Sequence, residues 1–106
     1  MVRKKVVLTS KIEEKLEGIG SRIKKARLRR NISAELLAKH AGISTGTMHA
    51  IETGSSTVSI GAYAAVLGLL EMDNDLDRIA LDTEGIQHFR ESEIYRRKRA
   101  SKSKRN

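Results

Sequence analysis

The sequence predicts an all-α fold of five helices, and three observations support this prediction. The chain of 106 residues contains no proline and many helix-favouring Ala, Leu, Ile, Lys and Arg residues. Apolar residues recur at helical spacing in several segments. Serine precedes most of these segments and glycine follows two of them, which is how helices are commonly capped. The length fits one small domain with extensions.

The first helix is predicted to begin at Ser10, with Glu13 three residues later completing a capping box. An apolar stripe follows at helical spacing, formed by Ile12, Leu16, Ile19, Ile23 and Ala26. Gly18 and Gly20 have low helix propensity. We therefore expect a firm helix only from about residue 20, ending near Asn31.

The second and third helices are short and close together in the sequence. Ser33 is predicted to cap the second, whose apolar face is Leu37, Ala38 and Ala41. Ser44 is predicted to cap the third, which turns Met48 and Ile51 inward and stops at Gly54.

Two further helices are predicted beyond a polar loop. Ser59 caps a fourth helix from Ile60 to about Leu70, which is apolar almost throughout. A fifth helix begins at Asn74 or Asp75. Its inward residues are predicted to be Leu76, Ile79 and Ala80.

The charge is divided sharply along the chain. The net charge is +8, with a basic stretch at residues 1–30, a net negative stretch at 31–89 and a basic stretch at 90–106. Residues 96–105 lack apolar periodicity, and such a segment cannot bury enough surface to fold. We therefore predict a basic arm at 1–10, a folded domain at 11–85 and a basic, disordered tail at 86–106. Basic arms of this kind bind polyanions or act only as solubilising tails.

The second and third helices, at 34–53, have the spacing of a helix-turn-helix. The turn is Gly42-Ile43-Ser44, in which glycine takes the left-handed conformation cheaply. Five apolar positions hold the two helices at a steep angle, namely Leu37, Ala41, Ile43, Met48 and Ile51. The alternative is a helical hairpin of the same geometry that has no role in DNA binding.

The segment Ile23–Leu70 resembles the Cro/repressor-type (XRE) helix-turn-helix domain. The resemblance implies the five-helix, lambda-repressor-like fold and a DNA-binding function. In that family an Arg on the first helix pairs with a Glu near the end of the recognition helix. The matching positions here are Arg27 and Glu52. The resemblance implies a partly buried ion pair, with Arg27 also near a phosphate.

If residues Thr45–Thr53 enter the major groove, the N-terminal positions of that helix meet the base edges. The predicted base-reading residues are Thr45, Gly46, His49 and Ala50. None is an Arg or Gln that could make a bidentate contact, so we expect DNA shape and two-fold symmetry to supply much of the specificity. His49 could also be an exposed side chain without a role.

Phosphate contacts are expected from the helix N-termini, from hydroxyl groups and from nearby cations. The family often has Gln at the start of the second helix, where this chain has Ala34. The predicted phosphate-contacting residues are Arg22, Arg27, Ser33, Lys39, Ser44, Thr47, Ser55, Ser56 and Thr57.

A homodimer is predicted, because one recognition helix reads only a few base pairs and dimers read two half-sites. The predicted dimer interface is Leu69, Leu70, Met72, Leu76 and Ile79. Core packing is the alternative for about half of these residues.

The C-terminal half resembles HipB-like antitoxins, which are encoded beside HipA-type kinases. The resemblance rests on Tyr63–Leu69, the acidic stretch Asp73–Asp77, residues Glu84–Gln87 and the basic tail. It implies autorepression of a toxin–antitoxin operon and a HipA-like kinase partner.

Several other functions are disfavoured by the sequence. With no cysteine, no glycine-rich phosphate loop and no metal-ligand spacing, we expect no enzyme, no metal and no cofactor. No apolar run reaches a membrane span and no signal peptide is seen, so we expect a cytoplasmic protein. The remaining alternatives are a stand-alone phage-type or metabolic regulator, a protein-interaction adaptor, and RNA or non-specific polyanion binding.

Overall fold

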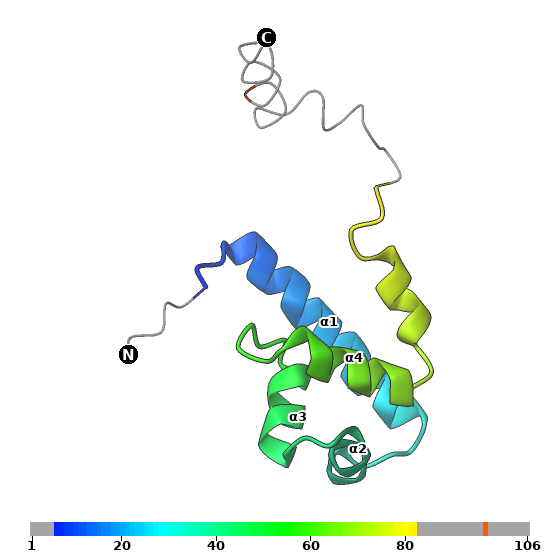
Figure 1. Ribbon diagram of the computed structural model, residues 1–106. Coiled ribbons are helices and arrows are strands. Elements are labelled where there is room, and N and C mark those ends of the chain that lie inside the picture. Colours follow the sequence, from blue (N-terminus) through cyan, green and yellow to red (C-terminus); the bar gives the residue numbers. More distant parts are fainter. Residues whose placement is uncertain (1–5, 83–96, 98–106) are drawn as a thin grey trace. The chain divides into compact units, whose positions relative to one another are not determined.

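The computed structural model describes residues 6–82 and Arg97. Over these residues the chain is all-helical, as predicted, with four α-helices and a final 3₁₀ helix (Figure 1). The chain divides into two units, Met1–Leu76 and Asp77–Asn106. All four α-helices lie in the first unit. The predicted basic tail at 86–106 lies outside the described residues apart from Arg97.

Helix α1 spans Ser10–Arg29 and is regular over its whole length. Thr9 caps it, because the Thr9 side chain accepts a hydrogen bond from the Ile12 N–H at 3.3 Å. The prediction of Ser10 as the cap was therefore wrong by one residue. The prediction of a firm helix only from residue 20 was also wrong. The helix runs unbroken through Gly18 and Gly20, because tertiary packing at Gly20 outweighs its low helix propensity.

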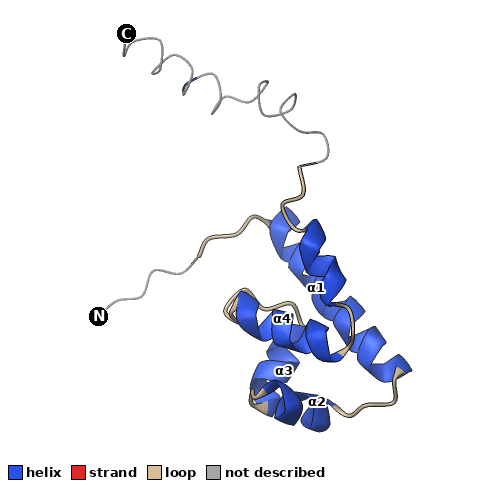
Figure 2. Ribbon diagram, turned by 45° about the vertical axis from the view of Figure 1, so that its right-hand side comes forward, coloured by secondary structure: helices blue, strands red, loops and turns tan. Residues whose placement is uncertain are grey.

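Helices α2 (Ala34–Ala41), α3 (Thr45–Glu52) and α4 (Ile60–Leu69) begin at the predicted caps. In each case the serine side chain accepts a backbone N–H three residues later, with Ser33, Ser44 and Ser59 as the caps. Figure 2 shows α2 and α3 joined by a short turn, with α4 across them. Helix α2 packs against both α3 and α4, and α1 packs against α3.

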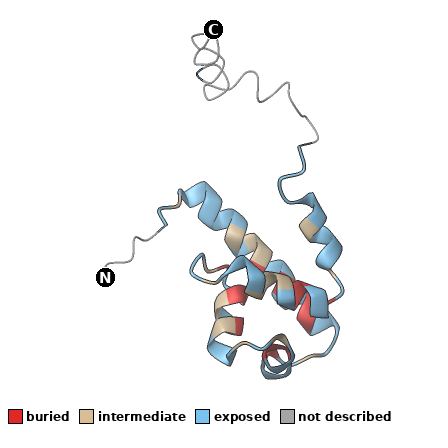
Figure 3. Cartoon of the chain, in the orientation of Figure 1, coloured by how far each residue is buried: buried red, intermediate tan, exposed pale blue. Residues whose placement is uncertain are grey.

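The core lies among the four α-helices, where the buried residues gather (Figure 3). Met48, Ile51, Val66 and Leu70 are completely buried, and Ile23 is 1% exposed. The smaller residues between them are Ala26, Ala34 and Ala38. The first half of the predicted α1 stripe lies outside this core, since Ile12 is 41% exposed and Leu16 is only partly buried.

The fifth element differs from the predicted α-helix. It is a six-residue 3₁₀ helix, η1 (Asp73–Arg78), with no buried residue. Leu76 packs partly against the core, as predicted, but Ile79 is 59% exposed and Ala80 is exposed. Ala80 has a left-handed φ of 60°, which is incompatible with a continuing α-helix. The prediction that Ile79 and Ala80 point inward was therefore wrong.

Candidate nucleic-acid interface

The turn between α2 and α3 fixes how α3 is presented. Gly42 ends α2 with a left-handed φ of 72°, a conformation that glycine adopts without steric cost. The Ile43 N–H then donates to the Ala38 carbonyl at 3.0 Å. Ser44 closes the turn, since its Oγ accepts the Thr47 N–H at 3.0 Å and donates to Thr47 Oγ1 at 3.0 Å. The chain thus enters α3 in one defined direction.

Helix α3 buries one side and leaves the other open. Met48 and Ile51 are completely buried, so the side that carries them faces the core. The predicted base-reading residues lie on the other side. Thr45, Gly46 and His49 are exposed, and Ala50 is partly buried. A helix held in this way can enter a major groove without disturbing its packing.

An ion pair ties α3 to α1. Arg27 Nε donates to Glu52 Oε2 at 2.6 Å, and Arg27 Nη2 donates to Glu52 Oε1 at 3.1 Å. Arg27 Nη1 donates to the Ile32 carbonyl at 2.8 Å, a partner that the sequence did not reveal. The hydrogen bond to Glu52 raises the pKa of Arg27 above its usual value, against the opposing effect of burial. The ion pair implied by the family resemblance is therefore present.

The same geometry argues against the predicted phosphate contact of Arg27. Its side chain is 10% exposed, and all three of its nitrogen atoms donate to protein acceptors. A guanidinium held in this way has little freedom to reach a phosphate. Arg27 thus holds the C-terminal end of α3 against α1, and we leave it out of the phosphate contacts proposed below.

Close backbone contact brings α1 and α3 together beside this pair. A Cβ atom added at Gly20 would lie 2.6 Å from the Ile51 carbonyl oxygen and 2.6 Å from the Gly54 nitrogen. A Cβ at Gly54 would collide with the Leu16 carbonyl, and Gly54 also has a left-handed φ of 77°. Both positions therefore require glycine. The sequence showed Gly54 as a helix stop, but nothing in it revealed the crossing with Gly20.

The loop after α3 carries the predicted phosphate-contacting hydroxyls. Ser56 and Thr57 are exposed, and Ser55 is partly buried, with Ser55 Oγ 2.7 Å from Thr57 Oγ1. The Tyr63 hydroxyl donates to the Ser55 carbonyl at 2.7 Å, and burial raises the pKa of Tyr63. Tyr63 was missed as a site residue because its position in α4 indicated only core packing. It fixes the loop beside α3.

A shallow open groove separates the first turn of α3 from the first turn of α4. Ser44, Gly46 and Thr47 line one side, and Thr57 and Ser59 contribute to the other. Two helix N-termini thus border one groove, and helix N-termini attract anions. The structure brings together here Ser44, Thr47 and Thr57, all predicted phosphate contacts. Ser33 is exposed at the start of α2.

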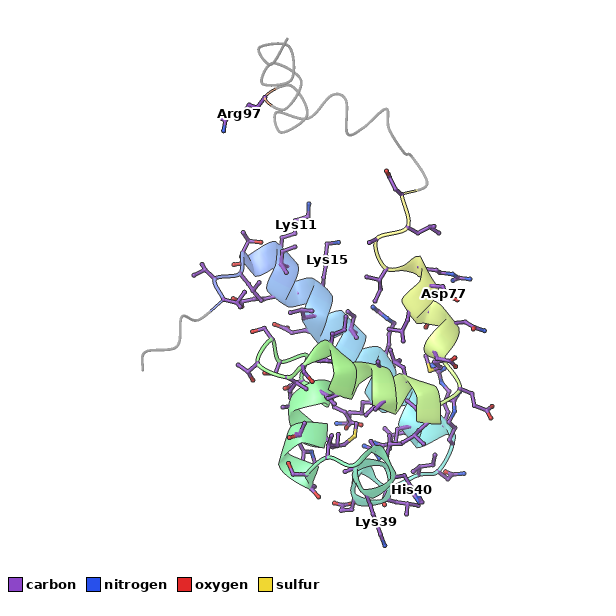
Figure 4. The ribbon with its side chains drawn as sticks, viewed as in Figure 1. Lys11, Lys15, Lys39, His40, Asp77 and Arg97 are labelled. Carbon is purple, nitrogen blue, oxygen red and sulfur yellow. The ribbon has the colours of Figure 1, made fainter. Side chains whose placement is uncertain are left out.

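Two of the predicted phosphate-contacting cations, Lys39 and Arg22, lie on different helices. Lys39 projects from α2 into solvent (Figure 4). Arg22 is exposed on α1 but lies two residues from Gly20, which is about 200° around the helix. Since Gly20 faces α3, Arg22 points away from it. Arg22 therefore lies on the side of α1 that faces away from α3, and we leave it out of the phosphate contacts proposed beside α3.

The predicted dimer residues differ in how far they are exposed to a partner chain. Leu70 is completely buried in the core of its own chain, so it is not available to a partner, and its prediction was wrong. Leu69 is 43% exposed. Met72 and Leu76 are partly buried against the core. Ile79 is exposed in the second unit.

Residues 6–82 and Arg97 contain no group of three or more His, Cys, Asp or Glu side chains that could hold a metal ion. Among the same residues, no helix combines the length and the apolar character needed to span a membrane.

Comparison with known proteins agrees with this geometry. A family model described as a helix-turn-helix domain matches residues 19–79, which is more than half of the chain. The match covers the second half of α1, all of α2, α3 and α4, and η1. No curated protein matches the chain.

Proposed function

The chain belongs to the helix-turn-helix domain family of the Cro/repressor kind, and from this premise we propose that it is a sequence-specific DNA-binding transcriptional repressor. The observation that carries the proposal is the open side of α3. Thr45, Gly46 and His49 are exposed there, while Met48 and Ile51 anchor the opposite side. In this proposal the chain acts in the cytoplasm by binding DNA and catalyses no reaction.

In the proposed complex, α3 lies in the major groove with its N-terminal residues toward the bases. Thr45 offers a hydroxyl and a methyl group, and the methyl suits thymine. His49 donates or accepts according to its tautomer. Phosphates flank the helix at Ser44, Thr47 and the Ser55–Thr57 loop, and at the start of α2 beside Ser33. Lys39 adds charge from α2.

The test is binding to the DNA upstream of the protein's own gene and to a scrambled duplex, measured across salt concentrations. A repressor is expected to prefer its own site by roughly 10³-fold or more. Thr45→Ala combined with His49→Ala should reduce that preference and leave binding to the scrambled duplex nearly unchanged. His40→Ala, which removes an exposed histidine of α2, is the matched control.

Three outcomes would contradict the proposal. Equal losses on both duplexes would reject the base-reading assignment. Equal and steeply salt-dependent binding of the unmodified chain to both duplexes would indicate a non-specific polyanion binder. Binding to neither duplex would favour a protein-interaction adaptor.

We also propose that the protein acts as a homodimer, because two recognition helices read a longer site. Exposed Leu69, with Met72 and Leu76, is the proposed contact in the first unit, and Ile79 is a separate candidate in the second. Sedimentation equilibrium of the unmodified chain should give twice the chain mass. Leu69→Glu should give a monomer, and a monomer for the unmodified chain would reject the dimer.

We further propose that the protein is an antitoxin that represses its own operon and binds a HipA-like kinase. This proposal is supported by the resemblance of the C-terminal half, part of which lies outside the described residues. Co-expression with the product of the adjoining gene should give a complex that survives gel filtration. Specific DNA binding without such a complex would favour a stand-alone phage-type or metabolic regulator.

A further inference from the structure

Five cations form a single row along α1. They are Lys11, Lys15, Arg22, Lys25 and Arg29, which we call the α1 row. At about 100° per residue these positions fall within about 40° of one line on the helix surface, and they span about 27 Å of its axis. All five are exposed. None makes an ion pair with any residue of the described part of the chain.

Gly18 lies on the same line of the helix surface as the α1 row, and its lack of a side chain leaves space for Arg22. A Cβ atom added at Gly18 would be 3.0 Å from Arg22 Nη1. The Arg22 side chain therefore extends toward the N-terminus of α1, and its guanidinium lies over Gly18. The charge of Arg22 thus lies between Lys15 and the backbone of Arg22. The three glutamates of α1 are at positions 13, 14 and 17, which all lie outside the row by the same helical geometry.

The α1 row faces away from the recognition helix. Gly20 and Arg27 mark the side of α1 that contacts α3, and this side lies roughly opposite the row on the helix. Lys11 and Lys15 accordingly project away from α2 and α3 in Figure 4. One straight duplex in contact with the open side of α3 would therefore not reach the row.

The composition of the α1 row indicates its partner. Protein interfaces have apolar or aromatic centres and are poor in Lys, whereas the row consists only of Lys and Arg. A membrane-bound helix needs an apolar face to insert, but Ile23 and Ala26 of α1 are buried in the core. Single-stranded nucleic acid is bound with aromatic stacking, and α1 has no aromatic residue. A straight array of cations fits the phosphates of duplex DNA.

We propose that the α1 row binds a second segment of duplex DNA, so that one protein molecule joins two duplexes. The contact is to phosphates and is independent of base sequence. It goes beyond the proposed repressor function and does not depend on base reading by α3. Five phosphate contacts would contribute a salt slope of about −4.5, at −0.9 for each contact.

Gly18 provides a test at a single position. An immobilised duplex carrying the upstream DNA is loaded with full-length protein, and capture of a labelled scrambled duplex is measured per bound protein. Gly18→Glu places an acid within the α1 row and should lower capture about tenfold, whereas Gly18→Lys should raise it. Gly18→Ala, which brings the same helix-favouring change without charge, should leave capture unchanged.

A second variant removes the charges themselves. Lys15→Gln, Arg22→Gln and Lys25→Gln together should weaken capture on the order of 100-fold at 0.15 M salt and reduce the salt slope by about 2.7. Lys24→Gln is the control, because Lys24 is an exposed cation of the same helix that lies outside the row. It should have little effect.

Failure of the α1 row proposal can be distinguished from failure of the repressor proposal. The row is rejected if the unmodified chain captures no second duplex, if Gly18→Glu and Gly18→Lys behave alike, or if Lys24→Gln weakens capture as much as the triple variant. The repressor proposal fails if the protein does not distinguish its upstream DNA from the scrambled duplex. In that case row-dependent capture should persist on two scrambled duplexes.

Discussion

Glu52, at the end of α3, accepts two hydrogen bonds from Arg27 of α1, at 2.6 and 3.1 Å, and both side chains are 10% exposed or less. The pair joins the end of the recognition helix to the long helix behind it. Removing one partner of a buried pair leaves the other charge without compensation, whereas replacing both with apolar residues is often neutral.

Glu52→Leu and Arg27→Met should each destabilise the protein, by about 3 kcal/mol. The double variant Arg27→Met with Glu52→Leu should recover most of that loss. Urea unfolding followed by circular dichroism gives the free energy of unfolding for each variant. Additive losses in the double variant would mean that the two side chains are not energetically coupled.

Gly18 and Gly20 should respond to alanine with opposite signs. Gly18→Ala has only the flexible end of Arg22 nearby and should stabilise the helix by about 1 kcal/mol. Gly20→Ala would force Cβ against the backbone of Ile51 and Gly54 and should destabilise by about 3 kcal/mol. Thermal unfolding of the two variants gives the comparison. Similar melting temperatures would contradict the close crossing of α1 and α3.

Ser44 allows the helix cap to be separated from the proposed phosphate contact. Ser44→Ala removes the acceptor for the Thr47 N–H and should cost about 1 kcal/mol of stability. Ser44→Asp keeps a good cap but places a negative charge where a phosphate is proposed. It should keep near-normal stability and weaken binding to specific and scrambled duplexes alike. Undiminished DNA binding by Ser44→Asp would remove Ser44 from the phosphate contacts.

Tyr63 should make stability decline at alkaline pH. Burial raises its pKa in the folded protein above the ordinary value of about 10. The unfolded chain therefore loses this proton first. The contribution is fully present below pH of about 10 and is lost as the pH rises through the folded-state pKa.

The measurement is the ultraviolet absorbance of tyrosinate in a Tyr95→Phe background, where Tyr63 is the remaining tyrosine. Its apparent pKa should lie above that of the urea-unfolded chain. Tyr63→Phe should flatten the decline in stability above about pH 10. It should also loosen the Ser55 loop, because the hydrogen bond to the Ser55 carbonyl is lost. Equal pKa values in folded and unfolded protein would contradict the burial of Tyr63.

Local chemistry in the sequence was sufficient to predict the helix-turn-helix. The caps at Ser33, Ser44 and Ser59 were predictable because each cap needs only a side-chain oxygen three residues before a backbone N–H. Met48 and Ile51 were predicted to point inward from their three-residue spacing. Gly42 was predictable because a short turn after a helix requires the left-handed conformation.

Only the tertiary structure decided the features that depend on residues far apart in the chain. Gly20 weakens an isolated helix but is required where α1 crosses α3, so helix propensity gave the wrong expectation. The packing of the helices also decides three other features. Arg27 donates to Glu52 and Ile32, Leu70 is buried in the core, and Arg22 lies on the side of α1 that faces away from α3. Sequence spacing determines which residues share a face of one helix, whereas packing between helices determines what that face meets.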